Sequence, residues 1–418
     1  MTQQVLQRPA DDDELRAWAR AERLYAQVAR QPASVLGLDC RLREGWFSDR
    51  YFMRAAATLV RDGRDPEVTM QVFAKKPGLV AGIPEVVRML QVAANPRYGA
   101  HSLRIQTLLD GEIANGPEVG GAGREDGRAM PWEPVMHVSG PYRAFAHLET
   151  PILGVLARRS LVASNTAAAV RAAGTKPVVF MAARHDDWRV QPGDGYAAMV
   201  GGAEAVSSDA GGGWVGAAGV GTMPHALIAA YGGDTVAATL AFCRYVRDAE
   251  PGTRVVSLVD YENDVVGTSL AVARAMRDEH GAGALHAVRV DTSESLVDRS
   301  LREDAKLAPP GDLAGVTPAL VRVLRDALDR EGFSDVGIVV SGGFTPDKIA
   351  AFEAAGVPVD GYGVGSSLIG HSDGRGGLMT GLDFTADIVI VNGCNEAKVG
   401  RGYAPSDRLV ELDWRHIE

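Results

Sequence analysis

The stretch from Val336 to Leu368 constrains the fold of this chain most, because two apolar strands there run directly into glycines. The first strand leads into Ser341-Gly342-Gly343, and Thr345-Pro346-Asp347 then supplies a helix cap, a proline at the first helical position and an early acid. The second strand leads into Gly363-Val364-Gly365-Ser366. Glycine lets backbone N–H groups approach a ligand, and a helix N-terminus beneath such groups binds anions. The two turns therefore predict the phosphate site of a βα barrel, which the loops after its last strands form. The alternative is that these glycines serve tight packing alone.

The chain after Thr150 alternates short apolar strands with helical segments. Continuous Val/Ile strands joined by helices predict a parallel sheet that is buried on both faces. No Gly-x-Gly-x-x-Gly follows the first of these strands, which argues against a dinucleotide-binding fold and an NAD-dependent oxidoreductase. The strands are expected to begin near Pro177, Ala203, Gly216, Arg254, Leu285, Val336 and Val359. The helices are expected over 153–173, 193–201, 223–231, 234–249, 264–280, 317–331 and 346–355.

The two ends of the chain follow another pattern, with a helix over 10–34, strands near Thr69 and Leu103, and a strand, Asn-Gly turn and strand after Asp387. We therefore predict an α/β protein with an irregular βα (TIM-like) barrel over 151–372. A smaller N-terminal α/β domain over 1–150 is completed by a C-terminal hairpin segment over 373–418.

Composition excludes several classes of protein. The formal net charge is -10, so no overall positive field attracts nucleic acid. No apolar run reaches the length of a membrane span, and the N-terminus is no signal peptide, so we expect a cytoplasmic protein. The three cysteines are widely spaced and predict reduced thiols rather than disulfides or a zinc site.

Polar side chains gather at the predicted carboxyl ends of the strands, where βα barrels hold their ligands. Basic groups, carboxylates and hydroxyls together suit a phosphorylated substrate with Mg²⁺. Taken singly, a strand-end arginine is often a surface ion pair, Asp260 could cap a helix, and His225 could be structural. The candidates are Arg184, His185, Ser207, Thr222, His225, Asp260, Arg289, Asp291 and the two glycine turns.

These motifs together resemble the nicotinate phosphoribosyltransferase family, one of the type II phosphoribosyltransferases, from about Ser48 to Gly400. Seven elements occur in the family's order, so the resemblance is specific. They are Ser48-Asp-Arg-Tyr51-Phe, Glu149-Thr-Pro-Ile-Leu-Gly, Phe180-x-x-Ala-Arg184-His185, Gly201-Gly with Ser207-Ser and Gly221-Thr222-Met-Pro-His225, Leu258-Val-Asp260, Val288-Arg289-Val-Asp291-Thr-Ser, and the two glycine turns.

The resemblance implies transfer of a phosphoribosyl group from phosphoribosyl pyrophosphate to nicotinate, with ATP as co-substrate or activator, in NAD biosynthesis. Asp260 and Asp291 would stabilise the oxocarbenium-like centre directly, through ribose hydroxyls or through Mg²⁺, which the protein alone would not hold. Arg184 and Arg289 would bind the nicotinate carboxylate or the phosphates.

Further roles follow from the same resemblance. His225 matches the histidine that ATP phosphorylates, and Tyr51 would stack on the pyridine ring from a neighbouring subunit, which implies at least a homodimer. Glu149, His185, Ser207 and Thr222 would line the substrate site. The 5′-phosphate would lie on Ser341, Gly342, Gly343, Gly363, Gly365 and Ser366.

The chain departs from the family pattern around the base pocket, where one of two expected arginines is replaced by His185. Three alternatives therefore stay open. The first is quinolinate as substrate, the second is another aromatic acid or amide such as nicotinamide, and the third is a barrel that binds phosphoribosyl ligands without turnover.

Overall fold

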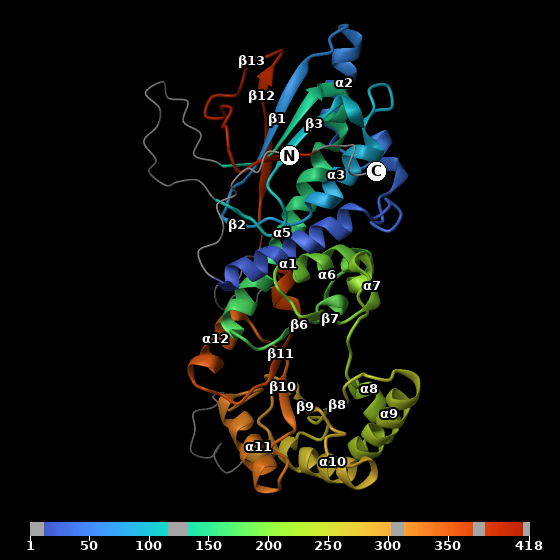
Figure 1. The fold of residues 1–418 in the computed structure, drawn as a ribbon, viewed down its shortest axis with the longest axis vertical. Coiled ribbons are helices and arrows are strands. Elements are labelled where there is room, and N and C mark those ends of the chain that lie inside the picture. The colour runs from blue at the N-terminus through green and yellow to red at the C-terminus, as the bar shows by residue number, and fades with distance from the viewer. Residues whose placement is uncertain (1–11, 116–132, 302–312, 371–380, 413–418) are drawn as a thin grey trace.

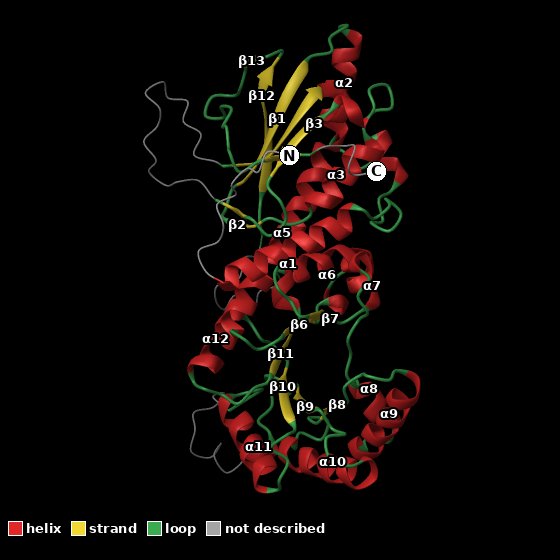
Figure 2. Cartoon of the chain, in the orientation of Figure 1, coloured by secondary structure: helices red, strands yellow, loops and turns green. Residues whose placement is uncertain are grey.

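The computed structural model describes residues 12–115, 133–301, 313–370 and 381–412, which form two main sheets with helices around them (Figures 1 and 2). One sheet is parallel and the other antiparallel, so the predicted α/β class is confirmed. Among these residues, no helix has the length and apolar character needed to span a bilayer.

The parallel sheet has six strands in the order β7-β6-β11-β10-β9-β8 and curls into half a barrel. Each strand is three or four residues long except β7, and its side chains are mostly buried, because helices cover the outer face. The sheet is open between its edge strands β7 and β8. Its strands are β6 (Val178–Phe180), β7 (Ala205–Val206), β8 (Val256–Leu258), β9 (Ala287–Val290), β10 (Gly337–Val340) and β11 (Gly361–Val364).

Six predicted strands of the parallel run are confirmed, but the strand expected at Gly216 is wrong. Gly216 instead ends a short helical turn in the left-handed conformation, with φ of 65°. The segment from Gly211 to Gly221 is rich in glycine and has few β-branched side chains, so little favours an extended ladder there. A single backbone bond, from Val220 to Val206, ties the segment to β7.

Seven helices that cover the parallel sheet lie at the predicted positions, with bounds that differ by a few residues. They are α5 (Glu149–Ala173), α6 (Gln191–Val200), α8 (His225–Ala230), α9 (Thr235–Ala249), α10 (Val265–His280), α11 (Pro318–Arg330) and α12 (Pro346–Ala354). The four-residue α7 (Asp209–Gly212) is an additional helix that the sequence did not predict.

The antiparallel sheet has the order β13-β12-β1-β5-β3-β14 and joins segments from both ends of the chain. Strand β12 pairs along nearly all of β1, from Val68 opposite Val391 to Ala74 opposite Phe384. Asn392 and Gly393 both have positive φ, 48° and 80°, as a two-residue hairpin turn requires. The strands are β1 (Glu67–Ala74), β3 (Arg104–Thr107), β5 (Pro134–Pro141), β12 (Phe384–Val391), β13 (Cys394–Asn395) and β14 (Val410–Glu411), and β2 (Gly78–Leu79) pairs with β4 (Ile113–Ala114).

Helix α5 connects the hydrophobic cores of the two sheets. Ile152 and Leu156 near its start pack with the antiparallel sheet, and Val162 and Ala169 further along pack with the parallel sheet. The proposed domain boundaries at 150 and 372 stay predictions, and the second lies outside the described residues. The remaining helices are α1 (Asp12–Ala29), α2 (Arg50–Arg61), α3 (Ile83–Ala93) and α4 (Tyr142–Phe145).

Candidate active site

The carboxyl ends of the parallel strands bring most of the predicted site residues to one edge of the curled sheet, which we call the mouth. Arg184 and His185 follow β6, Ser207 follows β7, and Asp260 follows β8. Asp291 follows β9, Ser341 and its glycines follow β10, and Gly365 follows β11. Parallel strands that share a ladder end at the same edge, so residues far apart in the sequence become neighbours here.

Asp291 and the first glycine turn are joined directly. The Ser341 hydroxyl donates a 2.8 Å hydrogen bond to Asp291 Oδ1. Gly342 has φ of 84°, and a Cβ atom there would lie 3.1 Å from the same oxygen. Glycine is therefore required both by the backbone conformation and by the closeness of the carboxylate.

His225 and Asp260 form a second pair. His225 is the first residue of α8, and its Nε2 lies 3.1 Å from Asp260 Oδ1 and 3.2 Å from Oδ2. The imidazole is 46% exposed and the carboxylate only 8%, so one member faces solvent and the other is buried. Burial raises the pKa of Asp260, His225 opposes that rise, and the negative charge of Asp291 adds to it.

Arg289 lies on β9 and interacts electrostatically with both Asp291 and Asp260. Burial lowers the pKa of its guanidinium, Asp291 and Asp260 oppose the change, and the positive charge of Arg184 adds to it. Its Nε atom, Thr222 Oγ1 and Thr292 Oγ1 are buried and have no hydrogen-bond partner among the described residues. Since buried polar atoms normally have partners, a polar ligand in the mouth would complete these groups.

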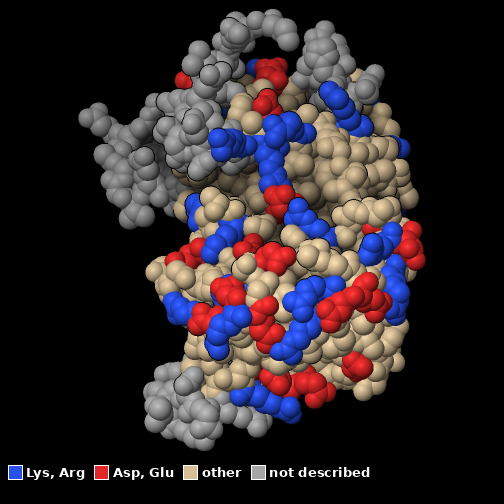
Figure 3. Space-filling view, turned by 60° about the horizontal axis from the view of Figure 1, so that its bottom comes forward, with Lys and Arg blue, Asp and Glu red and all other residues tan. Residues whose placement is uncertain are grey.

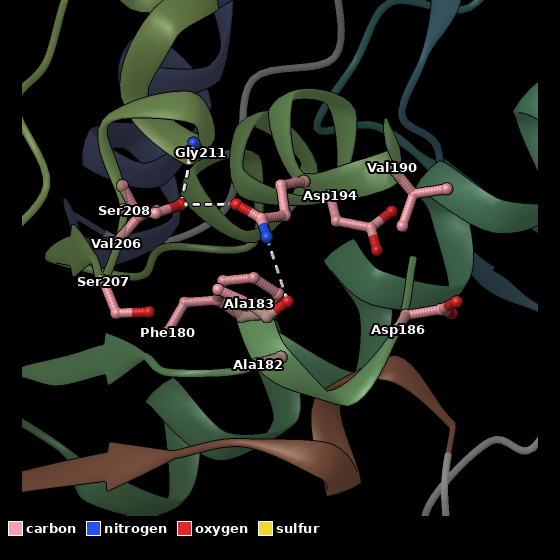
Figure 4. Close-up of a pocket in the computed structure, with 11 residues that line it drawn as sticks. Phe180, Ala182, Ala183, Asp186, Val190, Asp194, Val206, Ser207, Ser208 and Gly211 are labelled. Atoms are coloured by element: carbon pink, nitrogen blue, oxygen red, sulfur yellow. Dashed lines mark hydrogen bonds between the residues drawn. The ribbon is translucent and has the colours of Figure 1, made fainter. Parts of the chain in front are cut away.

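A small pocket lies between the ends of β6 and β7 (Figure 4). The side-chain amide of Gln191 donates to Ala183 O at 3.1 Å and its oxygen accepts from Ser208 Oγ at 3.0 Å, which holds the two strand ends together. Ser207 lines the pocket. The second glycine turn is close by, since a Cβ atom at Gly365 would lie 2.8 Å from His185 Cε1.

Two predicted site residues, Tyr51 and Glu149, do not reach the mouth within one chain. Tyr51 lies on α2, at the opposite end of the molecule from β8, β9 and β10 (Figure 1). Its ring is 60% exposed, and its hydroxyl lies 3.5 Å from Asp49 Oδ2. Asp49 also accepts a 3.0 Å hydrogen bond from the Thr150 hydroxyl. Burial, followed by the negative charges of Asp387 and Asp49, raises the pKa of Glu149 to about 8.

The described residues give little support to a charged binding patch on the face drawn in Figure 3 or to a metal site held by the protein alone. On this face (Figure 3), acidic and basic side chains alternate over the lower half rather than forming a patch of one sign. Within the described ranges, no three His, Cys, Asp or Glu side chains are grouped closely enough to hold a metal ion. That Mg²⁺ binds only together with substrate stays a prediction.

Sequence reasoning overlooked two residues beside the first glycine turn. Lys348 Nζ lies 3.5 Å from Gly342 O, and the Glu294 carboxylate lies against Gly343. One signal was available, because a lysine in the first turn of a helix opposes the helix dipole. Glu294 carried no signal, since its loop is close to the turn only in the folded chain.

Comparison with known proteins identifies relatives along most of the chain. Residues 49–160 match the family model described as the N-terminal domain of quinolinate phosphoribosyl transferase. The nicotinate phosphoribosyltransferase pncB1 of Mycobacterium tuberculosis is 32% identical over 343 residues, which cover 78% of this chain and 69% of that protein.

Two solved structures share the fold. The nicotinate-nucleotide pyrophosphorylase of Pyrococcus furiosus superposes with a TM-score of 0.68 at 26% identity, covering 90% of this chain and 84% of that one. Human nicotinic acid phosphoribosyltransferase superposes with a TM-score of 0.56 at 20% identity, covering 84% and 76%.

Proposed function

The chain belongs to the nicotinate phosphoribosyltransferase family, and we propose that nicotinate receives its phosphoribosyl group at the mouth of the curled parallel sheet. The reaction converts nicotinate and phosphoribosyl pyrophosphate into nicotinate mononucleotide and pyrophosphate, a step of NAD salvage. The observation that carries the placement is the convergence of Asp260, Arg289 and Asp291 with a glycine turn at one edge of the sheet.

Two carboxylates suit the charge that develops during this reaction. The bond from the ribose C1 to pyrophosphate breaks, the ring nitrogen of nicotinate supplies the electron pair for the new bond, and C1 gains positive charge in between. Asp291, held by Ser341, and Asp260, held by His225, are the acidic groups placed to stabilise that charge. Neither needs to reorient at the moment of reaction, because each is already hydrogen-bonded.

The arginines and the glycine turns would bind the anionic parts of the substrates, which are the nicotinate carboxylate and the phosphates. Arg289 is partly buried near the carboxylates and would bind the nicotinate carboxylate or a phosphate, with Arg184 as the second guanidinium. The backbone N–H groups of Gly342, Gly343, Gly363 and Gly365, with Ser341 and Ser366, would bind the 5′-phosphate.

Magnesium fits the same donor set. Asp260 and Asp291 interact electrostatically and offer carboxylate oxygens, which are the ligands that Mg²⁺ prefers. When bound with phosphoribosyl pyrophosphate, Mg²⁺ would neutralise charge on the departing pyrophosphate.

ATP would act through His225. If Asp260 accepts a hydrogen bond from Nε2–H, the other ring nitrogen of His225 carries the free electron pair. Attack by Nδ1 on the γ-phosphorus of ATP forms a phosphorus–nitrogen bond and releases ADP. Hydrolysis of that phosphohistidine during turnover would then draw the transfer forward.

A second chain would complete the site. Tyr51 is exposed on α2, as are Trp46 and Phe47 a few residues earlier in the chain, and is therefore available to the mouth of a neighbour. Stacking of Tyr51 on the pyridine ring, with Glu149 beside it, would make the enzyme at least a homodimer. We also propose that the curled sheet is the wall of an irregular βα barrel whose substrate lies at the mouth.

Quinolinate is the second candidate base, favoured by the family model that residues 49–160 match. Turnover separates the candidates. Purified protein is incubated with phosphoribosyl pyrophosphate and Mg²⁺ and with nicotinate, nicotinamide or quinolinate, each with and without ATP, and mononucleotide is followed by chromatography. Product from nicotinate alone, increased by ATP, is expected. Product from quinolinate would reassign the substrate, and no product from any base would favour a binding protein without turnover.

A further inference from the structure

The glycine turn after β10 lies between two carboxylates. Gly342 and Gly343 have φ of 84° and 64°, in the left-handed region. A Cβ atom at Gly342 would lie 3.1 Å from Asp291 Oδ1, and one at Gly343 would lie 2.0 Å from Glu294 Oε1. The Glu294 carboxylate, the end of a flexible side chain, therefore lies against the α-carbon of Gly343. A phosphate that approached this turn would meet two like charges.

One amine lies beside the same turn. Lys348 belongs to the first turn of α12, and its Nζ lies 3.5 Å from Gly342 O and 4.5 Å from the centroid of the Phe344 ring. No carboxylate of the described residues lies within 4.0 Å of this amine. Burial lowers the pKa of Lys348, and Glu294 opposes that change. The amine is thus partly desolvated and lacks a close anionic partner. It also lies at the N-terminal end of α12, where the helix dipole disfavours a cation.

We propose that Lys348 binds the 5′-phosphate of the ribosyl group, and that the Glu294 carboxylate occupies this place in the free enzyme and is displaced by the phosphate. The inference rests on the proposed function, which brings such a phosphate to this turn. Lys348 supplies the positive charge that offsets the two carboxylates.

The two carboxylates differ in their freedom to move. Asp291 is held by the Ser341 hydroxyl at 2.8 Å and stays beside the ribose. Glu294 lies on an exposed part of the loop after β9, and none of the hydrogen bonds or ion pairs described for the chain holds its side chain. It is therefore the group that can rotate away when phosphate arrives, and Lys348 would then pair with phosphate oxygens.

Calorimetric binding of nicotinate mononucleotide and nicotinate riboside tests the lysine, because these ligands differ only in the 5′-phosphate. Lys348→Met should weaken binding of the mononucleotide by about 10- to 100-fold, as expected for the loss of one charge-assisted contact. It should change the affinity for the riboside by less than about twofold. Lys75→Met, at an exposed ion pair with Asp383, is the matched control and should change neither. Equal weakening of both ligands, or no change in either, overturns the assignment.

Glu294→Gln tests the carboxylate. It should strengthen mononucleotide binding and lower the KM for phosphoribosyl pyrophosphate by about three- to tenfold, and inorganic phosphate should compete more strongly. Glu204→Gln, exposed at the opposite end of β7, is the control. Unchanged or weaker phosphate binding in Glu294→Gln overturns the displacement. If the wild-type protein neither binds the mononucleotide nor turns over nicotinate, the proposed function fails together with this inference; if it does both, only the inference is at stake.

Discussion

The imidazole Nε2 of His225 lies 3.1 Å from Asp260 Oδ1, although 35 positions separate the two residues in the chain. The carboxylate is buried after β8 and the imidazole is half exposed at the start of α8, so Asp260 orients the ring. The ring nitrogen that faces away from Asp260 is the one open to an incoming phosphoryl group.

His225→Gln should abolish transfer of radioactive phosphate from γ-labelled ATP to the protein. Asp260→Asn should reduce labelling by at least about tenfold, because the amide holds the imidazole in the required tautomer less firmly. The measurement is label retained by the denatured protein at alkaline pH, where phosphohistidine persists. Undiminished labelling of His225→Gln would contradict the assigned acceptor.

Ser341→Ala should lower kcat by about five- to tenfold, because the Asp291 carboxylate loses the hydroxyl that holds it, a contribution of about 1 kcal/mol. Asp291→Asn should lower kcat by at least about 100-fold, because an amide cannot balance the charge at C1. Steady-state kinetics with nicotinate measure both, and circular dichroism checks the fold. A fully active Asp291→Asn would exclude this carboxylate from catalysis.

Glu149 should make the folded state less stable as pH rises. Burial, and then the charges of Asp387 and Asp49, raise its pKa to about 8, above its ordinary value of 4.5. Between these two pH values the unfolded chain has released the proton and the folded chain still holds it, so the free energy of unfolding falls with pH, by roughly 2–4 kcal/mol over the interval. Denaturant titrations from pH 5 to 8.5 should show a shallower fall for Glu149→Gln. Equal slopes in wild type and variant would contradict the raised pKa.

Arg159→Leu should destabilise the fold by about 3–5 kcal/mol. Its guanidinium lies 2.9 Å from Glu85 Oε2 and 2.9 Å from Asp194 Oδ1, and its loss leaves the buried Glu85 without a cation and Asp194 with Arg158 alone. Arg274→Leu, which breaks an exposed pair with Glu331, is the control and should cost less than about 1 kcal/mol. Chemical denaturation compares the two. A cost for Arg159→Leu no larger than that of the control would show that Arg158 and water compensate the two carboxylates.

Mixed variants test the shared site. Tyr51→Ala and Asp291→Asn should each be nearly inactive, and a refolded equimolar mixture should recover up to about a quarter of wild-type activity, because half of the dimers then hold one intact site of two. Analytical ultracentrifugation checks that mixed dimers form. No recovery in mixed dimers would mean that Tyr51 does not act across subunits.

Local patterns along the chain predicted most of the secondary structure. The Asn392-Gly393 hairpin, the Thr345-Pro346 helix start and the short apolar strands are encoded by residues close in sequence, through backbone preference and helix capping. The strand expected at Gly216 failed for the same kind of reason, since its glycines favour a turn. The candidate residues at strand ends were predictable as well, because parallel strands place their carboxyl ends at one edge.

Which of the site residues contact one another, in contrast, was decided only by the tertiary structure. The bond between Ser341 and Asp291 joins positions 50 residues apart, and the position of Glu294 against Gly343 depends on how the loop after β9 packs on the turn after β10. The sequence alone determined which chemical groups end each strand, because strand ends are set by local preferences. Which of these groups touch, and that Tyr51 lies away from the mouth of its own chain, followed from the packing of the two cores around α5, which no local pattern encodes.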